Sequence, residues 1–127
     1  MNHKIIYSEN APKPGGHYSQ AVVHNNLVYV SGQLAIDAVS GEKLVDKDIK
    51  EQTLKCLNNL EQILISAGSN KEKLIKSTVF ISKIEYWPEV NQVFIQFFGD
   101  HKPARSIVPV NDLHYGLKIE IEAIAYI

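Results

Sequence analysis

The segment 117–127 reads L-K-I-E-I-E-A-I-A-Y-I and alternates as a strand of a half-buried sheet does. The alternation places isoleucines and alanines on one face and Glu120 and Glu122 on the other. The two carboxylates are then neighbours at i and i+2, roughly 6.5–7 Å apart. The two glutamates can lie on a sheet face that solvent covers, or one of them can belong to a functional site. The alternation of the strand does not indicate which of the two that would be.

Arg105 begins a second strand-like run, R-S-I-V-P-V, upstream of that segment. Because the run after it is apolar, we expect the guanidinium to leave the end of the sheet near a cleft. There it can bind a planar carboxylate through two parallel hydrogen bonds. A salt bridge to Glu120 or Glu122 at the rim explains the same residue equally well. Pro109 interrupts the run and indicates an edge strand or a bulge.

Two amphipathic helices are predicted upstream of these strands. The first starts near Asp48, which has capping-box spacing to Glu51, and it stops at Gly68 after apolar residues that recur at the helical period. The second runs from about Tyr86 to Phe98, with a proline in its first turn and a buried stripe of aromatic and aliphatic residues. Each helix therefore has one face that must be covered.

The remaining apolar segments read as strands. Residues 21–31 form a predicted hairpin with its turn at Asn25-Asn26, and the β-branched run 76–82 is a further strand. The order β-β-β-α-β-α-β-β predicts an α+β fold, a mixed six-stranded sheet with two helices on one face. We expect a single domain over residues 1–127. Since L-V-Y-V-S is apolar on both faces, the other sheet face also needs a cover, which a homotrimer supplies.

Composition excludes several classes of protein. Thirteen basic and 14 acidic side chains give a net charge of −1, so no electrostatic footprint for nucleic acid or an anionic membrane is expected. The single cysteine, Cys56, lies on the apolar stripe of the first helix and is expected in the core. One cysteine, no membrane span and no signal-peptide segment predict a cytoplasmic protein. The five histidines show no metal-binding spacing, so no metal is expected.

Several short motifs occur in order along the chain. They are N-A-P (10–12), G-x-Y-S-Q-A (16–21), Y-V-S-G-Q (29–33), T-V-F (78–80), V-N-x-V-F (90–94), P-A-R-S (103–106) and E-I-E-A-I-A (120–125). In this order and spacing the chain resembles the Rid/YjgF family, and most of all its RidA branch, over nearly its full length. The resemblance implies a chorismate-mutase-like fold, a homotrimer with clefts between subunits, and hydrolysis of 2-imino acids to 2-oxo acids and ammonia.

The resemblance also implies roles for individual residues. Arg105 matches the arginine that binds the substrate carboxylate, and Glu120 matches the carboxylate that handles the attacking water. Glu120 or Tyr18 then returns a proton to the departing ammonia, with no metal or organic cofactor. Four further positions match residues that line the same cleft: Ser31, Gly32, Asn91 and Ile107.

The leading hypothesis is therefore a 2-iminobutanoate/2-iminopropanoate deaminase. A ribonuclease or translation inhibitor, as several relatives are described, is a second reading, although the balanced charge and the lack of a basic-aromatic patch count against it. A non-enzymatic module that binds small carboxylates or acts as a chaperone is a third. The chain departs from the usual family pattern at four positions: His17, Lys102, Pro109 and His114. Of these, Lys102 and His114 can alter the substrate range, although neither is one of the matched catalytic positions.

Overall fold

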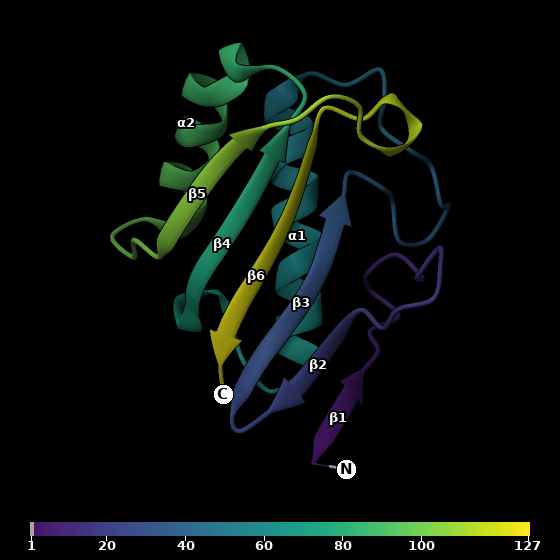
Figure 1. Cartoon of the computed structure of the whole chain (residues 1–127), viewed down its shortest axis with the longest axis vertical. Coiled ribbons are helices and arrows are strands. Elements are labelled where there is room, and N and C mark those ends of the chain that lie inside the picture. The colour runs from purple at the N-terminus through teal and green to yellow at the C-terminus, as the bar shows by residue number, and fades with distance from the viewer. Residues whose placement is uncertain (1) are drawn as a thin grey trace.

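A computed structural model describes residues 2–127, so residue 1 of the predicted domain lies outside the described residues. The chain forms a six-stranded sheet in the order β1-β2-β3-β6-β4-β5 (Figure 1). Neighbouring strands are antiparallel except β4 and β5, which are parallel, so the sheet is mixed as predicted. The strands are β1 (His3–Ile6), β2 (Ala21–His24), β3 (Leu27–Leu34), β4 (Leu74–Ile81), β5 (Ala104–Pro109) and β6 (Ile119–Tyr126).

Strand β6, the segment that suggested the fold, lies in the interior of the sheet between β3 and β4. Its isoleucines and alanines are buried on one face, whereas Glu120 is half-buried and Glu122 is exposed on the other. The predicted alternation is therefore confirmed.

Two further local predictions are confirmed. The hairpin between β2 and β3 turns at Asn25 and Asn26, which both have positive φ. Pro109 ends β5, which is an edge strand, as its sequence indicated.

Two helices cover one face of the sheet, as Figure 1 shows. Helix α1 (Ile49–Ser66) begins after Asp48, whose side chain accepts a hydrogen bond from the backbone N–H of Glu51. Helix α2 (Trp87–Phe98) packs beside α1 and has a proline in its first turn. Three short 3-10 helices complete the chain: η1 (Lys71–Lys73), η2 (Ile84–Tyr86) and η3 (His114–Gly116). None of the helices within residues 2–127 combines the length and apolarity needed to cross a membrane.

The core lies between the helices and the sheet, and Cys56 is fully buried in it. Its thiol lies 3.7 Å from the carbonyl oxygen of Ile119, and burial raises the pKa of the thiol far above its usual range. A thiol held neutral in this way is a poor nucleophile. Cys56 is thus a core residue, as predicted.

The face of the sheet opposite the helices is uncovered within the subunit, and it exposes large apolar side chains as well as the polar residues of β6. The strand register places Ile5, Tyr29, Val108 and Tyr126 on this open face. Their side chains remain 62%, 43%, 37% and 44% exposed. Several large apolar side chains exposed on one face are typical of a face that another chain covers.

Candidate active site

An irregularity in the pairing of β3 with β6 shapes the first part of the site. Val30 pairs with Ala123 and Gln33 with Ile121, so Ser31 and Gly32 together stand opposite the single residue between those partners on β6. This is a β-bulge, which bends a strand and redirects its side chains and is common beside active sites. The S-G pair thus interrupts β3 next to the polar face of β6.

Gly32 leaves room for the carboxylate of Glu120. A Cβ atom at Gly32 would collide with Oε2 of Glu120 and would lie 2.9 Å from its Cδ, closer than real Cβ atoms approach. The backbone of β3 and the side chain of Glu120 can therefore lie this close only because residue 32 is glycine.

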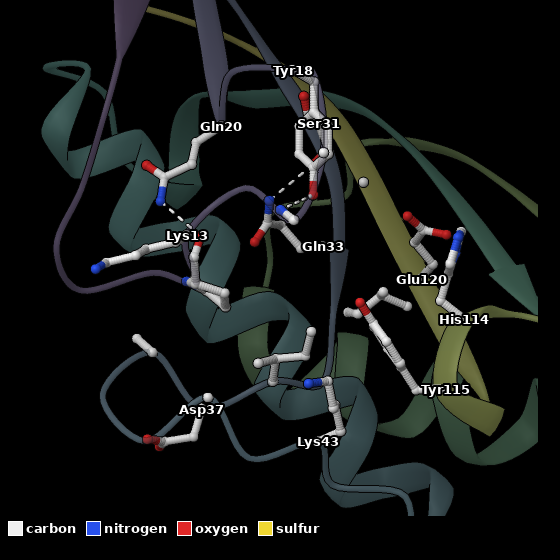
Figure 2. A pocket seen from close by; sticks show the side chains of 18 of the residues that line it. Lys13, Tyr18, Gln20, Ser31, Gln33, Asp37, Lys43, His114, Tyr115 and Glu120 are labelled. Atoms are coloured by element: carbon white, nitrogen blue, oxygen red, sulfur yellow. Dashed lines mark hydrogen bonds between the residues drawn. The ribbon is translucent and has the colours of Figure 1, made fainter.

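A cavity of about 640 Å³ opens over this pair and is lined by Tyr18, Ser31, Gly32 and Glu120 (Figure 2). Four of the seven predicted site residues thus share one cavity.

The surroundings of Glu120 shift its pKa. Partial burial raises the pKa of Glu120 above its usual value. The nearby charge of Glu122 also raises this pKa, whereas His114 lowers it. A carboxyl group with a raised pKa is suited to general acid–base work close to neutral pH.

The loop that carries Tyr18 is held by a buried glutamine. The Gln20 side chain accepts a hydrogen bond from the Ser8 N–H at 2.6 Å and donates to the carbonyls of Ser8 and Pro12 at 3.1 and 2.9 Å. The Tyr18 hydroxyl in turn accepts from the Gly15 N–H at 3.1 Å. Gln20 lies in the motif G-x-Y-S-Q-A, but nothing in the motif itself indicated that its side chain would hold the loop.

The other three predicted residues form a separate group around β5 and α2. The Nη2 atom of Arg105 donates to Oδ1 of Asn91 at 3.0 Å. The guanidinium carbon lies 4.9 Å from the ring centroid of Phe94 and 5.7 Å from that of Trp87. Ile107, two residues along β5, lies on the same side of the strand. Partial burial lowers the pKa of Arg105, which nevertheless stays a cation at neutral pH.

Arg105 and Glu120 lie on opposite faces of the sheet. Ser77 on β4 pairs with Arg105 on one side and with Ala123 on the other, which places Arg105 on the helix face. Glu120 pairs with Phe80 and belongs to the open face. Within residues 2–127 the ion pair is Lys55–Asp37, so the salt bridge between Arg105 and a β6 glutamate, the alternative reading of the sequence, is wrong for this subunit.

The cavity is also lined by residues that were not predicted as site residues, among them Lys43, His114 and Tyr115. The Lys43 ammonium lies 4.7 Å from the centroid of the Tyr115 ring, and the rings of His114 and Tyr115 are 5.9 Å apart. The sequence showed His114 only as a departure from the usual family residue. Its place beside the cavity depends on the fold of the η3 turn, which no spacing rule indicated.

Two of the other unusual positions do not contribute to this cavity. His17 and Lys102 are exposed and do not line it. Over residues 2–127, no group of three His, Cys, Asp or Glu side chains is arranged to hold a metal ion.

The family model described as Endoribonuclease L-PSP matches residues 8–127. The chain belongs to this family. That result confirms the resemblance to Rid/YjgF proteins, since relatives with the same fold include a Rid family protein of Yersinia pestis. Members of the L-PSP family thus share the six-stranded α+β fold described above.

Several L-PSP family relatives cover nearly the whole chain. A RutC family protein of Pyrococcus horikoshii is 44% identical over 123 residues, 97% of each sequence. The 2-iminobutanoate/2-iminopropanoate deaminase of Bos taurus is 40% identical over 122 residues, 96% of this chain and 88% of the bovine protein. The crystal structure of E. coli TdcF with bound serine superposes with a TM-score of 0.92 at 37% identity, covering 98% of each chain. The relatives of this L-PSP family protein therefore include imine deaminases.

Proposed function

We propose that the protein is a 2-iminobutanoate/2-iminopropanoate deaminase that works in clefts between the subunits of a homotrimer. One observation carries the proposal: the carboxylate-binding group and the general base lie on opposite faces of one sheet. A single subunit cannot bring them together. Two neighbouring subunits can, if the Arg105 group of one faces the Glu120 cavity of the next.

The position of β5 suits this arrangement. Because β5 is an edge strand, Arg105 lies at the border of the subunit, where it can reach a neighbour. The uncovered face, which exposes large apolar side chains and also carries Glu120, supplies the surface that a neighbour would bury. The proposed trimer therefore covers this face and completes the site in one step.

Arg105 is the group that binds the substrate carboxylate in this proposal. Its hydrogen bond to Asn91 and the rings of Phe94 and Trp87 hold the plane of the guanidinium. A guanidinium held in one plane offers two parallel N–H groups to a carboxylate. Bound serine in TdcF shows that a relative accommodates a small molecule with a carboxylate.

Glu120 is the general base. It accepts a proton from water as the water oxygen bonds to the carbon of the protonated imine, and the product of this step is a neutral carbinolamine. The protonated carboxyl group then gives its proton to the amine nitrogen, directly or through Tyr18. The C–N bond breaks and ammonia leaves, the hydroxyl proton passes to Glu120 as the carbonyl of the 2-oxo acid forms, and loss of that proton to the released ammonia restores the carboxylate. One positioned base contributes about 10²–10⁴-fold, and orientation by Arg105 adds to this.

The proposal is tested by coupling the purified protein to a threonine dehydratase and following 2-oxobutanoate formation in the presence of semicarbazide, which competes for the imine. We expect the protein to raise the yield of 2-oxobutanoate at the expense of the semicarbazone. A yield that does not depend on the protein would reject the deaminase and favour a module that only binds carboxylates. RNA cleavage that survives repeated purification and disappears in Arg105→Ala would favour the ribonuclease.

Three variants separate the proposed roles. Arg105→Lys keeps the charge but loses the paired N–H groups, so KM should rise and 2-oxobutanoate should bind more weakly in calorimetry. Glu120→Gln keeps the size of the side chain but removes the base, so kcat should fall roughly 10²–10⁴-fold while ligand binding survives. Glu122→Gln is the matched control, and its effect on turnover at neutral pH should be small. Loss of turnover in Glu122→Gln with full turnover in Glu120→Gln would reverse the assignment of the base.

A further inference from the structure

Gln33 is a buried amide in β3 that also lines the cavity, and the proposed mechanism gives it no role. It is 5% exposed and pairs with the buried Ile121 of β6, so its side chain lies on the helix face of the sheet. The buried residues that precede it in this strand, Val28 and Val30, are apolar. An amide in such a position costs free energy unless its polar atoms are hydrogen-bonded. The burial of Gln33 therefore points to a specific task for its side chain.

The β-bulge determines which residues of β3 face Glu120. Regular alternation buries every second residue, but the next buried residue after Val30 is Gln33, three positions along the strand. The extra residue of the bulge turns Gly32 toward the open face, where the Glu120 carboxylate occupies the space of the missing Cβ atom. Without the bulge, Gly32 would point into the core and Gln33 toward the open face. The contact between Gly32 and Glu120 therefore depends on the bulge.

Hydrogen bonds to Ser31 hold the bulge from two sides. Its N–H donates to the carbonyl of Gln20 at 2.9 Å, and its hydroxyl donates to the carbonyl of Ser19 at 2.6 Å, so both bonds tie the bulge to the loop before β2. Its carbonyl accepts a hydrogen bond from Nε2 of Gln33 at 3.2 Å. Figure 2 shows the amide nitrogen of Gln33 directed toward Ser31. A bulge disrupts the ladder of hydrogen bonds between strands, and here a buried side chain of the same strand bonds to its backbone.

We propose that Gln33 is a positioning residue for the base: its amide holds the Ser31–Gly32 bulge, and the bulge keeps open the space beside Gly32 that the Glu120 carboxylate occupies. The inference rests on the proposed role of Glu120 as general base. Gln33 acts through the backbone of β3 and not on the substrate.

Loss of the hydrogen bond from Gln33 should slow the chemical step and leave substrate binding intact. In the proposed trimer the substrate carboxylate is bound by Arg105 of the partner subunit. The Arg105 guanidinium is held by Asn91 and by two aromatic rings of α2, and not by the bulge. A change at Gln33 therefore displaces the base while the group that binds the carboxylate stays in place, so kcat should fall and KM should not rise.

The test compares Gln33→Met, which keeps the length of the side chain but loses the amide, with Thr53→Val. Thr53 is buried in α1 outside the cavity, and its hydroxyl donates to the carbonyl of Ile49 at 2.7 Å, so both variants lose one buried hydrogen bond at nearly constant size. In Gln33→Met we expect kcat to fall about 10- to 100-fold while KM stays within about twofold. Thr53→Val should keep full turnover.

A second variant covers a failure of Gln33→Met to fold. Gln33→Asn keeps a polar amide, but its side chain is one carbon shorter and should not reach the carbonyl of Ser31, so its kcat should also fall. Full turnover in either Gln33 variant, or equal losses of kcat in Gln33→Met and Thr53→Val, would overturn the proposal.

A double variant tests whether Gln33 acts through the place of Glu120. Gly32→Ala displaces the carboxylate directly, so Gln33→Met should add little in a protein that already carries Gly32→Ala. We expect the combined loss of kcat to be smaller than the product of the two single losses. A combined loss equal to that product would show that the two residues act independently, against the proposal.

A further measurement needs no substrate. The side-chain carboxyl carbon of Glu120, labelled with ¹³C and assigned by its absence in Glu120→Gln, reports the surroundings of that group by NMR at a single pH. We expect its resonance to move in Gln33→Met and in Gly32→Ala but not in Thr53→Val. If it does not move in Gln33→Met, Gln33 does not position the carboxylate, whatever the enzyme does. If it moves but Glu120→Gln keeps full turnover, the positioning of Glu120 stands and the proposed function fails.

Discussion

At the scale of single residues, the site depends on the absence of a Cβ atom at residue 32. Gly32 has no side chain, and the carboxylate of Glu120 occupies the space that a Cβ atom would take. A substitution at this position therefore acts on the base itself. Because the Glu120 side chain is flexible and half-buried, it can move aside at small cost, so the effect should fall on activity more than on folding.

Gly32→Ala should lower kcat on the order of 10²-fold, the cost of displacing a catalytic group by about 1 Å. Its melting temperature should stay within a few degrees of that of the unmodified protein, since the displaced group is a side-chain end. Steady-state kinetics and thermal unfolding measured on one preparation give both numbers. A variant that keeps full turnover would show that Glu120 does not need the place it occupies over Gly32.

Asn91 is the second single residue whose substitution gives a specific prediction, because its side-chain oxygen accepts a hydrogen bond from the Arg105 guanidinium. Asn91→Asp keeps the shape but creates an anion that pairs with Arg105 and repels a substrate carboxylate. KM should rise about tenfold or more, since charge-assisted hydrogen bonds are worth about 1.5–3 kcal/mol. Asn91→Ala is the matched variant without the charge and should raise KM less. Equal KM values in the two variants would argue against a substrate carboxylate at Arg105.

At the scale of elements, the loop before β2 is held in place by one buried side chain. Gln20 bonds to backbone groups of that loop, and the loop carries Tyr18 into the cavity. Loops seldom hold a side chain accurately without such a support. Stability and activity should therefore be coupled at this position.

Gln20→Ala should lower the free energy of unfolding by about 2–3 kcal/mol, because it leaves buried backbone groups without partners. It should also lower kcat, because Tyr18 loses its support. Asp48→Ala is the control: it removes the cap of α1, away from the cavity, and should cost about 1 kcal/mol with turnover intact. Urea unfolding and the coupled assay measure both effects. A Gln20→Ala protein with full turnover would show that the position of Tyr18 is not needed.

At the scale of the whole molecule, the two halves of the site predict that subunits can complement one another. Arg105→Ala and Glu120→Ala should each be inactive alone. If each site takes Arg105 from one subunit and Glu120 from the next, random reassembly of equal amounts should leave about one quarter of the sites complete. Light scattering should give a mass near three times 14.3 kDa for every species.

The experiment unfolds the two variants together in urea, refolds them and measures imine hydrolysis. Recovery of about a quarter of the unmodified activity would support a shared site, and variants mixed without unfolding provide the background. No recovery after confirmed subunit exchange would place both residues of a working site in one chain. That outcome would contradict the arrangement proposed here.

The sequence by itself determined the features that depend on nearby residues. The alternation in β6 predicted its buried face, the Asp48–Glu51 spacing predicted the start of α1, and Asn25-Asn26 predicted the hairpin turn. Each of these follows from backbone geometry within a few residues, so a local pattern is enough to read it. The motifs and their order also predicted the family, which the match over residues 8–127 confirms.

Only the tertiary structure decided how the site residues are arranged. A period-2 pattern is the same whichever strand lies beside it, so it does not predict the order β3-β6-β4-β5 or the register that places Arg105 and Glu120 on opposite faces. The bulge at Ser31-Gly32 and the place of His114 beside Glu120 likewise arise from contacts between distant segments. Such contacts form because packing and hydrogen bonding are satisfied across the whole sheet at once, and no short stretch of sequence contains that information.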